Sequence, residues 1–134
     1  MRGRVLFDGE ARGAALVLRE PLSLWGGLDP ETGVLIDAHH PQRGAVLTDR
    51  VLVMSGGRGS SSSSSVLVEA IRTGSAPAAI LLSEPDLILA VGAAVGEELY
   101  GRRIPVLALD ATDLAGIADG TPLRITTGGE VHAG

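Results

Sequence analysis

Cysteine is absent from this sequence of 134 residues. The chain therefore forms no disulfide bond, and it offers no thiolate that could hold a zinc ion or an iron–sulfur cluster. Lysine is absent as well, because all 11 basic residues are arginine. A lysine Schiff base and a lysine general base are thereby excluded from the chemistry of this chain.

Aromatic side chains are scarce, with one Phe, one Trp and one Tyr. Hydrophobic residues still make up 45% of the sequence, which is enough for a real core and far above a disordered composition. Aliphatic side chains must fill that core, which suits an α/β or β-rich domain with closely packed elements. The length fits one compact domain, so we expect a single domain over residues 1–134.

Positive charge is also limited, since the net charge is −5 and the arginines form no run. Nucleic-acid binding needs basic side chains opposite the phosphates, so we expect no nucleic-acid partner. Gly, Pro or a charge interrupts each apolar run before it reaches membrane-spanning length, and the opening MRGRVLFDGE lacks the apolar core of a signal peptide. We therefore expect no membrane contact and a cytoplasmic location.

Short apolar segments alternate with turn residues along the chain. Strands are predicted at residues 4–6, 14–18, 34–37, 50–54, 78–82, 104–109 and 123–126. The first two strands flank a turn-rich segment, as in a hairpin or a wide loop. Helices are predicted at 66–72 and 86–99, with a helical turn at 113–117, and the glycines Gly92 and Gly96 suggest close packing of the second helix on a neighbour. This order indicates the α/β class, as a β/β/α or α/β sandwich.

A glycine–serine turn is the most distinctive feature of the chain. The sequence SGGRGSSSSSS at residues 55–65 stands between the strand at 50–54 and the helix at 66–72. The first turn of a helix leaves N–H groups free at the positive end of the macrodipole, so it stabilises an anion. Arg58 could hold a carboxylate through two hydrogen bonds, and a serine here could act as an alkoxide base. A flexible linker and helix-capping serines are the alternatives.

The Gly- and Pro-rich segment at residues 21–33 holds the only tryptophan, Trp25. Together with Gly26 and Gly27, Trp25 could form a substrate or interface lip. The alternative is that Trp25 anchors the loop in the core. Asp29, beside Pro30, is predicted to cap a turn.

Asp37, His39 and His40 are a further candidate cluster, for acid chemistry or for a metal. Two adjacent histidines on a strand point to opposite faces, so they cannot both face one site. A structural or supporting role is therefore favoured, with a catalytic contribution from His40 as the alternative.

These segments together resemble one family, the small subunit of aconitase X. The resemblance covers essentially the whole chain and rests on PLSLWGGLDPETG at 21–33, Ile36 to Gly44, SGGRGSS at 55–61, APAAI at 76–80, and GEELYG at 96–101 leading to Pro105 and Val106. The resemblance implies the swivelling β/β/α domain of aconitase-like enzymes. It also implies a two-chain hydro-lyase whose iron–sulfur cluster is held by cysteines of the large subunit. Substrates of the family include cis-3-hydroxy-L-proline and mevalonate 5-phosphate.

The resemblance further implies roles for individual residues. In the aconitase-like Gly-x-Gly-Ser-Ser turn the first serine is the base, and at residues 57–61 this serine is Ser60. The serine run extends to Ser65, which leaves Ser61 and Ser62 as alternatives. No metal or cofactor is expected on this chain itself. The residues expected to bind substrate are Arg58, Gly59, Ser61, Ser62, Trp25, Gly26 and Gly27, and those expected to support them are Asp37 and His40.

Two other classes of function stay open at this point. Some swivelling domains carry a phosphoryl group on a histidine, in which case His40 would be the functional residue and Ser60 an anion-binding cap. A binding module without chemistry is the other alternative. Within the enzyme class, the arginine-only composition indicates a GC-rich genome and so favours the hydroxyproline substrate over mevalonate 5-phosphate.

Overall fold

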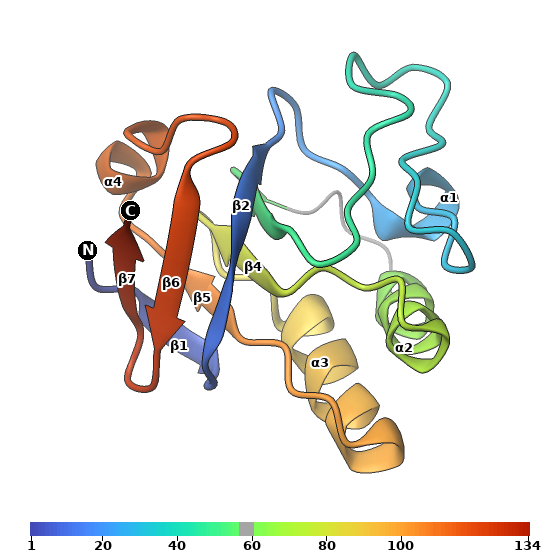
Figure 1. Ribbon diagram of the computed structural model, residues 1–134. Helices are drawn as coiled ribbons and strands as arrows, with labels where there is room; N and C mark the ends of the chain where they lie inside the picture. The colour runs from blue at the N-terminus through green and yellow to red at the C-terminus, as the bar shows by residue number, and fades with distance from the viewer. Residues whose placement is uncertain (57–60) are drawn as a thin grey trace.

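The structure is a computed structural model that describes residues 1–56 and 61–134 (Figure 1). Its strands are β1 (Arg4–Phe7), β2 (Ala11–Val17), β3 (Val51–Met54), β4 (Ala79–Leu82), β5 (Val106–Ala108), β6 (Pro122–Thr126) and β7 (Glu130–Ala133). Its helices are α1 (Leu24–Gly27), α2 (Ser63–Thr73), α3 (Leu87–Tyr100) and α4 (Ala111–Ala115). The predicted α/β class is confirmed.

The strands form one curled sheet in the order β1-β5-β4-β3-β2-β6-β7. Its centre is parallel, because β2 pairs with β3, β3 with β4, and β4 with β5. Its two ends are antiparallel, since β1 pairs with β5 and β6 pairs with both β2 and β7. The first two strands therefore stand apart in the sheet, and the hairpin alternative for them is wrong.

Different layers cover the two faces of the sheet, as the alternating side chains of β3 show. Leu52 and Met54 belong to a core shared with α2 and α3. Val51 and Val53 belong to a second core, shared with β6, β7 and α4. The hairpin of β6 and β7 thus curls over the face opposite the helices (Figure 1). The layers are β/β/α, as predicted.

Helix α2 contacts α1 on one side and α3 on the other. The close approach of α2 and α3 depends on glycine, as predicted. A Cβ added to Gly92 would lie 3.0 Å from the carbonyl oxygen of Ser64, and one added to Gly96 would lie 2.2 Å from Cδ1 of Ile71. Larger residues at these positions would push the two helices apart.

The ends of α3 confirm the helix predicted at residues 86–99. The Asp86 carboxylate caps its start by accepting hydrogen bonds from the N–H groups of Ile88 and Leu89, at 2.9 and 3.2 Å. Gly101 stops the helix in a left-handed conformation, with φ 72°.

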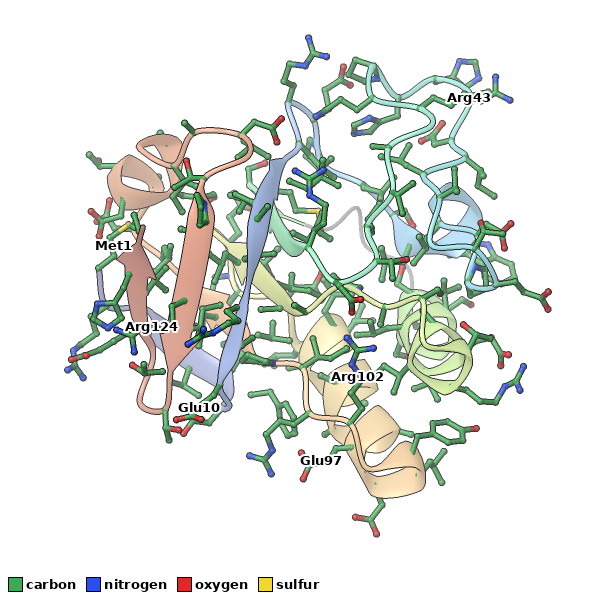
Figure 2. All side chains as sticks on the ribbon, viewed as in Figure 1. Met1, Glu10, Arg43, Glu97, Arg102 and Arg124 are labelled. Atoms are coloured by element: carbon green, nitrogen blue, oxygen red, sulfur yellow. The ribbon has the colours of Figure 1, made fainter. Side chains whose placement is uncertain are left out.

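Ion pairs fasten the segment that connects α3 to β5. Arg102 donates to the Asp49 carboxylate at 2.9 Å, and Arg103 donates to the Glu97 carboxylate at 2.6 Å. The hydrogen bond to Glu97 raises the pKa of Arg103 above its ordinary value. Glu97 and Arg102 both lie on the side of the molecule that carries α3 (Figure 2). The two pairs therefore hold α3 and the loop before β3 against the segment that connects α3 to β5.

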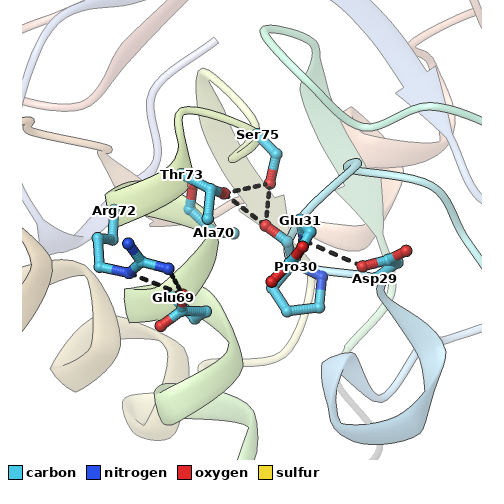
Figure 3. Close-up of polar contacts among 8 residues, drawn as sticks. All are labelled: Asp29, Pro30, Glu31, Glu69, Ala70, Arg72, Thr73 and Ser75. Atoms are coloured by element: carbon cyan, nitrogen blue, oxygen red, sulfur yellow. Dashed lines mark hydrogen bonds and ion pairs between the residues drawn. The ribbon is translucent and has the colours of Figure 1, made fainter.

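The loop at residues 28–50 is fastened to the end of α2. The carbonyl oxygen of Pro30 accepts hydrogen bonds from the hydroxyl groups of Thr73 and Ser75 (Figure 3). Within the loop, the Asp29 carboxylate accepts the N–H of Glu31 at 3.0 Å, which is the predicted turn cap. The loop is therefore built onto the helix layer.

The strand predicted at residues 34–37 is wrong. Val34 and Leu35 make only isolated bridges, to Val46 and Leu28 respectively. Gly33 turns the chain immediately before them in a left-handed conformation, with φ 76°, and another turn follows at 38–39. The extended run between the two turns is too short for a ladder.

Two elements lie outside the predicted set, α1 and β7. Strand β7 pairs with β6 across a turn at which Gly128 and Gly129 have positive φ values of 94° and 88°. Helix α2 is longer than predicted, since it begins at Ser63 inside the serine run. No helix in the described part of the chain is both long and apolar enough to cross a bilayer.

Candidate active site

The two ends of the glycine–serine turn lie at the carboxyl edge of the parallel strands. β3 ends at Met54, and Ser55 and Gly56 lead away from it. The predicted site residues Arg58, Gly59 and Ser60 lie outside the described residues, which resume at 61. Helix α2 begins directly afterwards. Open α/β sheets bind their ligands at this edge.

Ser61 and Ser62 form the turn that enters α2. Ser62 is the residue before the helix, yet its backbone is already helical (φ −70°, ψ −14°) and its side chain makes no capping hydrogen bond. The Ser64 hydroxyl donates to the carbonyl oxygen of Ser61 at 2.9 Å. The capping alternative is therefore wrong for Ser62. Within the described residues the hydroxyl groups of Ser61 and Ser62 make no hydrogen bond, so they stay available beside the free N–H groups of the first turn.

Ser63 brings the tryptophan segment to the serine run. Ser63 is buried, and its Oγ lies 3.5 Å from Oγ of Ser23. The same Oγ accepts the backbone N–H of Trp25 at 3.4 Å. These contacts place the first turn of α2 against α1. The structure thus brings together segments predicted to share one site.

The Trp25 side chain is 60% exposed, so the alternative that it anchors the core is wrong. The α1 turn is kinked, because Gly26 is left-handed with φ 78°. Gly27 is buried, and a Cβ added to it would lie 2.6 Å from Cδ1 of Leu22. The two glycines therefore shape the turn, and Trp25 projects from it where a ligand or partner could contact it.

A hollow of about 260 Å³ opens at the same edge of the sheet, lined in part by Arg19, Ser55 and Ser83. The Ser83 hydroxyl donates to the carbonyl oxygen of Ser55 at 2.8 Å, and the N–H of Glu84 donates to the same oxygen at 2.9 Å. An anionic ligand in this hollow would lie beside Arg19, whose side chain could pair with it.

Arg19, Ser63 and Glu84 were not among the predicted site residues. Arg19 follows β2 and Glu84 follows β4, the strands on either side of β3 in the sheet. Residues that follow neighbouring parallel strands meet at one edge. That strand order was the missing signal, because the sequence does not show which strands are neighbours.

His40 and Asp37 take structural roles. His40 is buried, with Nε2 3.0 Å from the carbonyl oxygen of Glu20 and Nδ1 accepting the N–H of Gln42 at 3.1 Å. Both ring nitrogens are thus engaged, which leaves neither free for a phosphoryl group and disfavours the carrier alternative. Asp37 accepts the N–H of the exposed His39 at 2.9 Å.

Asp37 also lies behind the tryptophan turn. The N–H of Ile36 donates to the carbonyl oxygen of Gly27 at 2.8 Å, and a Cβ added to Gly27 would lie 3.9 Å from Cβ of Asp37. The backbone next to Asp37 therefore supports the turn that carries Trp25, while the contacts of His40 hold the 28–50 loop against Glu20.

The family model of the aconitase X swivel domain matches residues 1–133. The chain belongs to the aconitase X swivel domain family. The predicted family and the predicted swivelling β/β/α fold are thereby confirmed. The crystal structure of Thermococcus kodakaraensis aconitase X in its holo form has a TM-score of 0.86 to this swivel domain and is 34% identical, covering 98% of this chain and 95% of that chain.

Named relatives of this swivel domain are dehydratases of two kinds. The phosphomevalonate dehydratase small subunit of Thermococcus kodakarensis is 35% identical over 133 residues, which cover 98% of this chain and 94% of the relative. The cis-3-hydroxy-L-proline dehydratase of Pseudomonas aeruginosa is 54% identical over 106 residues, which cover 79% of this chain but 18% of the relative. The chain thus spans less than a fifth of the length of the cis-3-hydroxy-L-proline dehydratases that it matches.

The residues of this swivel domain do not fit an iron–sulfur cluster. The sequence has no cysteine to supply thiolate ligands. Among residues 1–56 and 61–134, no three His, Asp or Glu side chains gather so that they could hold a metal ion. The thiolate ligands of an iron–sulfur cluster at the serine turn would therefore have to come from another polypeptide segment.

Proposed function

We propose that this chain is the small subunit of a cytoplasmic, two-chain hydro-lyase that dehydrates a small hydroxy acid, and that it acts as one swivel domain. The observation that carries the proposal is the meeting of the serine run with the exposed Trp25 turn at the carboxyl edge of the sheet. A relative that matches nearly the whole chain is named a dehydratase small subunit. This chain would then supply half of a shared active site.

Ser60 is the proposed base. It precedes the first helical residue of α2 by three positions, and the free N–H groups and positive dipole of a helix start would stabilise a serine oxyanion. The alkoxide would take the proton from the carbon α to the substrate carboxylate. The electron pair of the broken C–H bond would then form the carbon–carbon double bond as the bond to the hydroxyl group on the neighbouring carbon breaks. The departing hydroxide would take up a proton, in net the one that the serine removed, so that water leaves and the alkoxide is restored.

The remaining residues of the turn would bind the substrate. Arg58 would hold its carboxylate through two hydrogen bonds, and Gly59 would let the backbone approach closely. Ser61 and Ser62 carry hydroxyl groups that are unbonded within the described residues, so either could donate to the substrate or replace Ser60 as the base. Trp25 would close the site from the α1 side.

The large subunit holds the iron–sulfur cluster in this proposal, because the present chain has no cysteine. When bound there, the cluster would supply a Lewis acid for the departing hydroxyl group. The small subunit alone would accordingly bind substrate weakly and turn nothing over.

Cis-3-hydroxy-L-proline is the substrate we favour over mevalonate 5-phosphate. The identity of 54% to a cis-3-hydroxy-L-proline dehydratase, against 34–43% to phosphomevalonate dehydratase small subunits, supports this choice. A phosphate group would also call for additional cations around the site, and Arg19 is the arginine that lines the hollow at this edge in the described part of the chain.

Co-expression with the cysteine-bearing large chain from the same genome tests the proposal. The two chains should co-purify as a coloured complex that dehydrates one of the two substrates, and each chain alone should be inactive. A chain that fails to bind the large subunit, or a complex that dehydrates neither substrate, would contradict the proposed function.

A further inference from the structure

The outward face of α3 is apolar along its whole length. Leu87, Val91, Val95 and Leu99 are 68%, 56%, 40% and 60% exposed. Side chains four residues apart lie on the same side of a helix, so these four form a continuous band, which we call the α3 stripe. The charged residues of α3 are Glu97 and Glu98, both in its last turn. Before that last turn α3 is apolar on every side, and a helix of this kind is normally buried.

A groove of about 340 Å³ lies between the α3 stripe and α2. Its charged lining residue, Glu69, forms an ion pair with Arg72, and the other lining residues are valines, a glycine and serines. The residues that line it are Ser64, Ser65, Val68 and Glu69 of α2 and Val91, Gly92 and Val95 of α3.

The groove adjoins the serine run at the start of α2. Ser64 and Ser65 belong to the serine run that begins at Ser60. Helices α2 and α3 follow β3 and β4, which are adjacent parallel strands, so both helices begin at the same edge of the sheet. A polypeptide that closes over the serine turn therefore also meets the first turns of α3, at Leu87 and Val91.

We propose that the α3 stripe and its groove form the docking surface for the large subunit, which contributes an apolar segment to it. This inference rests on the proposed function. The large subunit must reach the serine turn, and the groove adjoins that turn through Ser64 and Ser65, so the large subunit is the partner that would cover it. The relatives are consistent with a larger partner beside this domain. The matching region makes up 18% of the Pseudomonas aeruginosa dehydratase, and the matching protein of Thermococcus kodakarensis is named a small subunit.

The Val91→Asp variant tests the docking surface. Val91 is solvent-exposed in the isolated chain, so the variant should fold, and its thermal unfolding should match that of the wild type. In the complex the new carboxylate would be buried without a partner, so binding of the purified large subunit should weaken by at least about tenfold. Val46→Asp is the matched control, because Val46 is a valine of similar exposure, 46%, in the 28–50 loop; its binding should be unchanged.

Hydrogen exchange gives a readout that needs no variant. Residues 87–99 should exchange more slowly in the wild-type complex than in the isolated chain. Equal binding by Val91→Asp, or no protection of α3, overturns the inference while the proposed function stands. A wild-type chain that never binds the large subunit instead overturns the proposed function. An isolated chain that dimerises through α3, with a dimer that Val91→Asp dissociates and unaltered large-subunit binding, would assign the surface to a second copy and so refute the proposal.

Discussion

Replacing Gly33 by alanine should destabilise the domain far more than a routine glycine substitution. Gly33 has a left-handed φ of 76°, and a Cβ added to it would lie 2.1 Å from Oγ1 of Thr48 and 2.8 Å from the carbonyl oxygen of Ser75. The left-handed backbone costs alanine about 1–2 kcal/mol. Overpacking adds about 1–3 kcal/mol. Moving Thr48 also breaks its 2.9 Å hydrogen bond to Ser75, a loss of about 1 kcal/mol.

The expected decrease in the free energy of unfolding is therefore about 3–6 kcal/mol, a large part of the stability of a small domain. Gly74→Ala is the matched control, because Gly74 has nearly the same φ, 79°, and no atom within 4 Å of an added Cβ. It should lose only about 1–2 kcal/mol. Urea unfolding followed by circular dichroism measures both variants. Equal losses would refute the packing of the 28–50 loop against the end of α2.

Two further predictions concern the helices that carry the site and the docking surface. Asp86→Ala should lower the free energy of unfolding by about 1 kcal/mol in urea unfolding, because it removes the cap of α3, and Asp86→Asn should lose less; equal losses would exclude the cap as the cause. Arg72 lowers the pKa of Glu69 by hydrogen bonding, so the stabilisation from this pair is present above the ordinary carboxyl pKa and is lost as the pH falls through the lowered one. In Arg72→Ala an NMR titration should show the Glu69 pKa back near its ordinary value; an unchanged pKa would contradict the pairing drawn in Figure 3.

Local signals in the sequence were sufficient for the central elements. The helix at 86–99 was predictable because Asp86 and Gly101 cap its two ends, and β3 because it is a short apolar run buried on both faces. The segment at 34–37 has the same apolar character as a strand, but flanking turns leave it no partner to form a ladder with. Likewise β7 is half polar, and only its pairing with β6 makes it a strand.

The site was predictable in part, for a similar reason. The strand–turn–helix order around the serine run and the neighbouring Trp25 segment could be read from the sequence and its resemblance to a family. The approach of Ser63 to Ser23 and Trp25 could not, because it depends on how α1 packs against α2. Arg19 and Glu84 were missed because strand order, not chain order, brings them to the edge where β3 ends.

The turnover of a Ser60→Ala variant in the two-chain complex tests the central claim most directly. The variant should still bind the large subunit, and its dehydration rate should fall by at least about a hundredfold, as expected for loss of a general base. Ser61→Ala and Ser62→Ala, measured in parallel, should lower the rate less than Ser60→Ala, because each would remove a contact to the substrate and not the base. A Ser60→Ala complex that dehydrates substrate at a near-wild-type rate would contradict the assignment of this serine as the base.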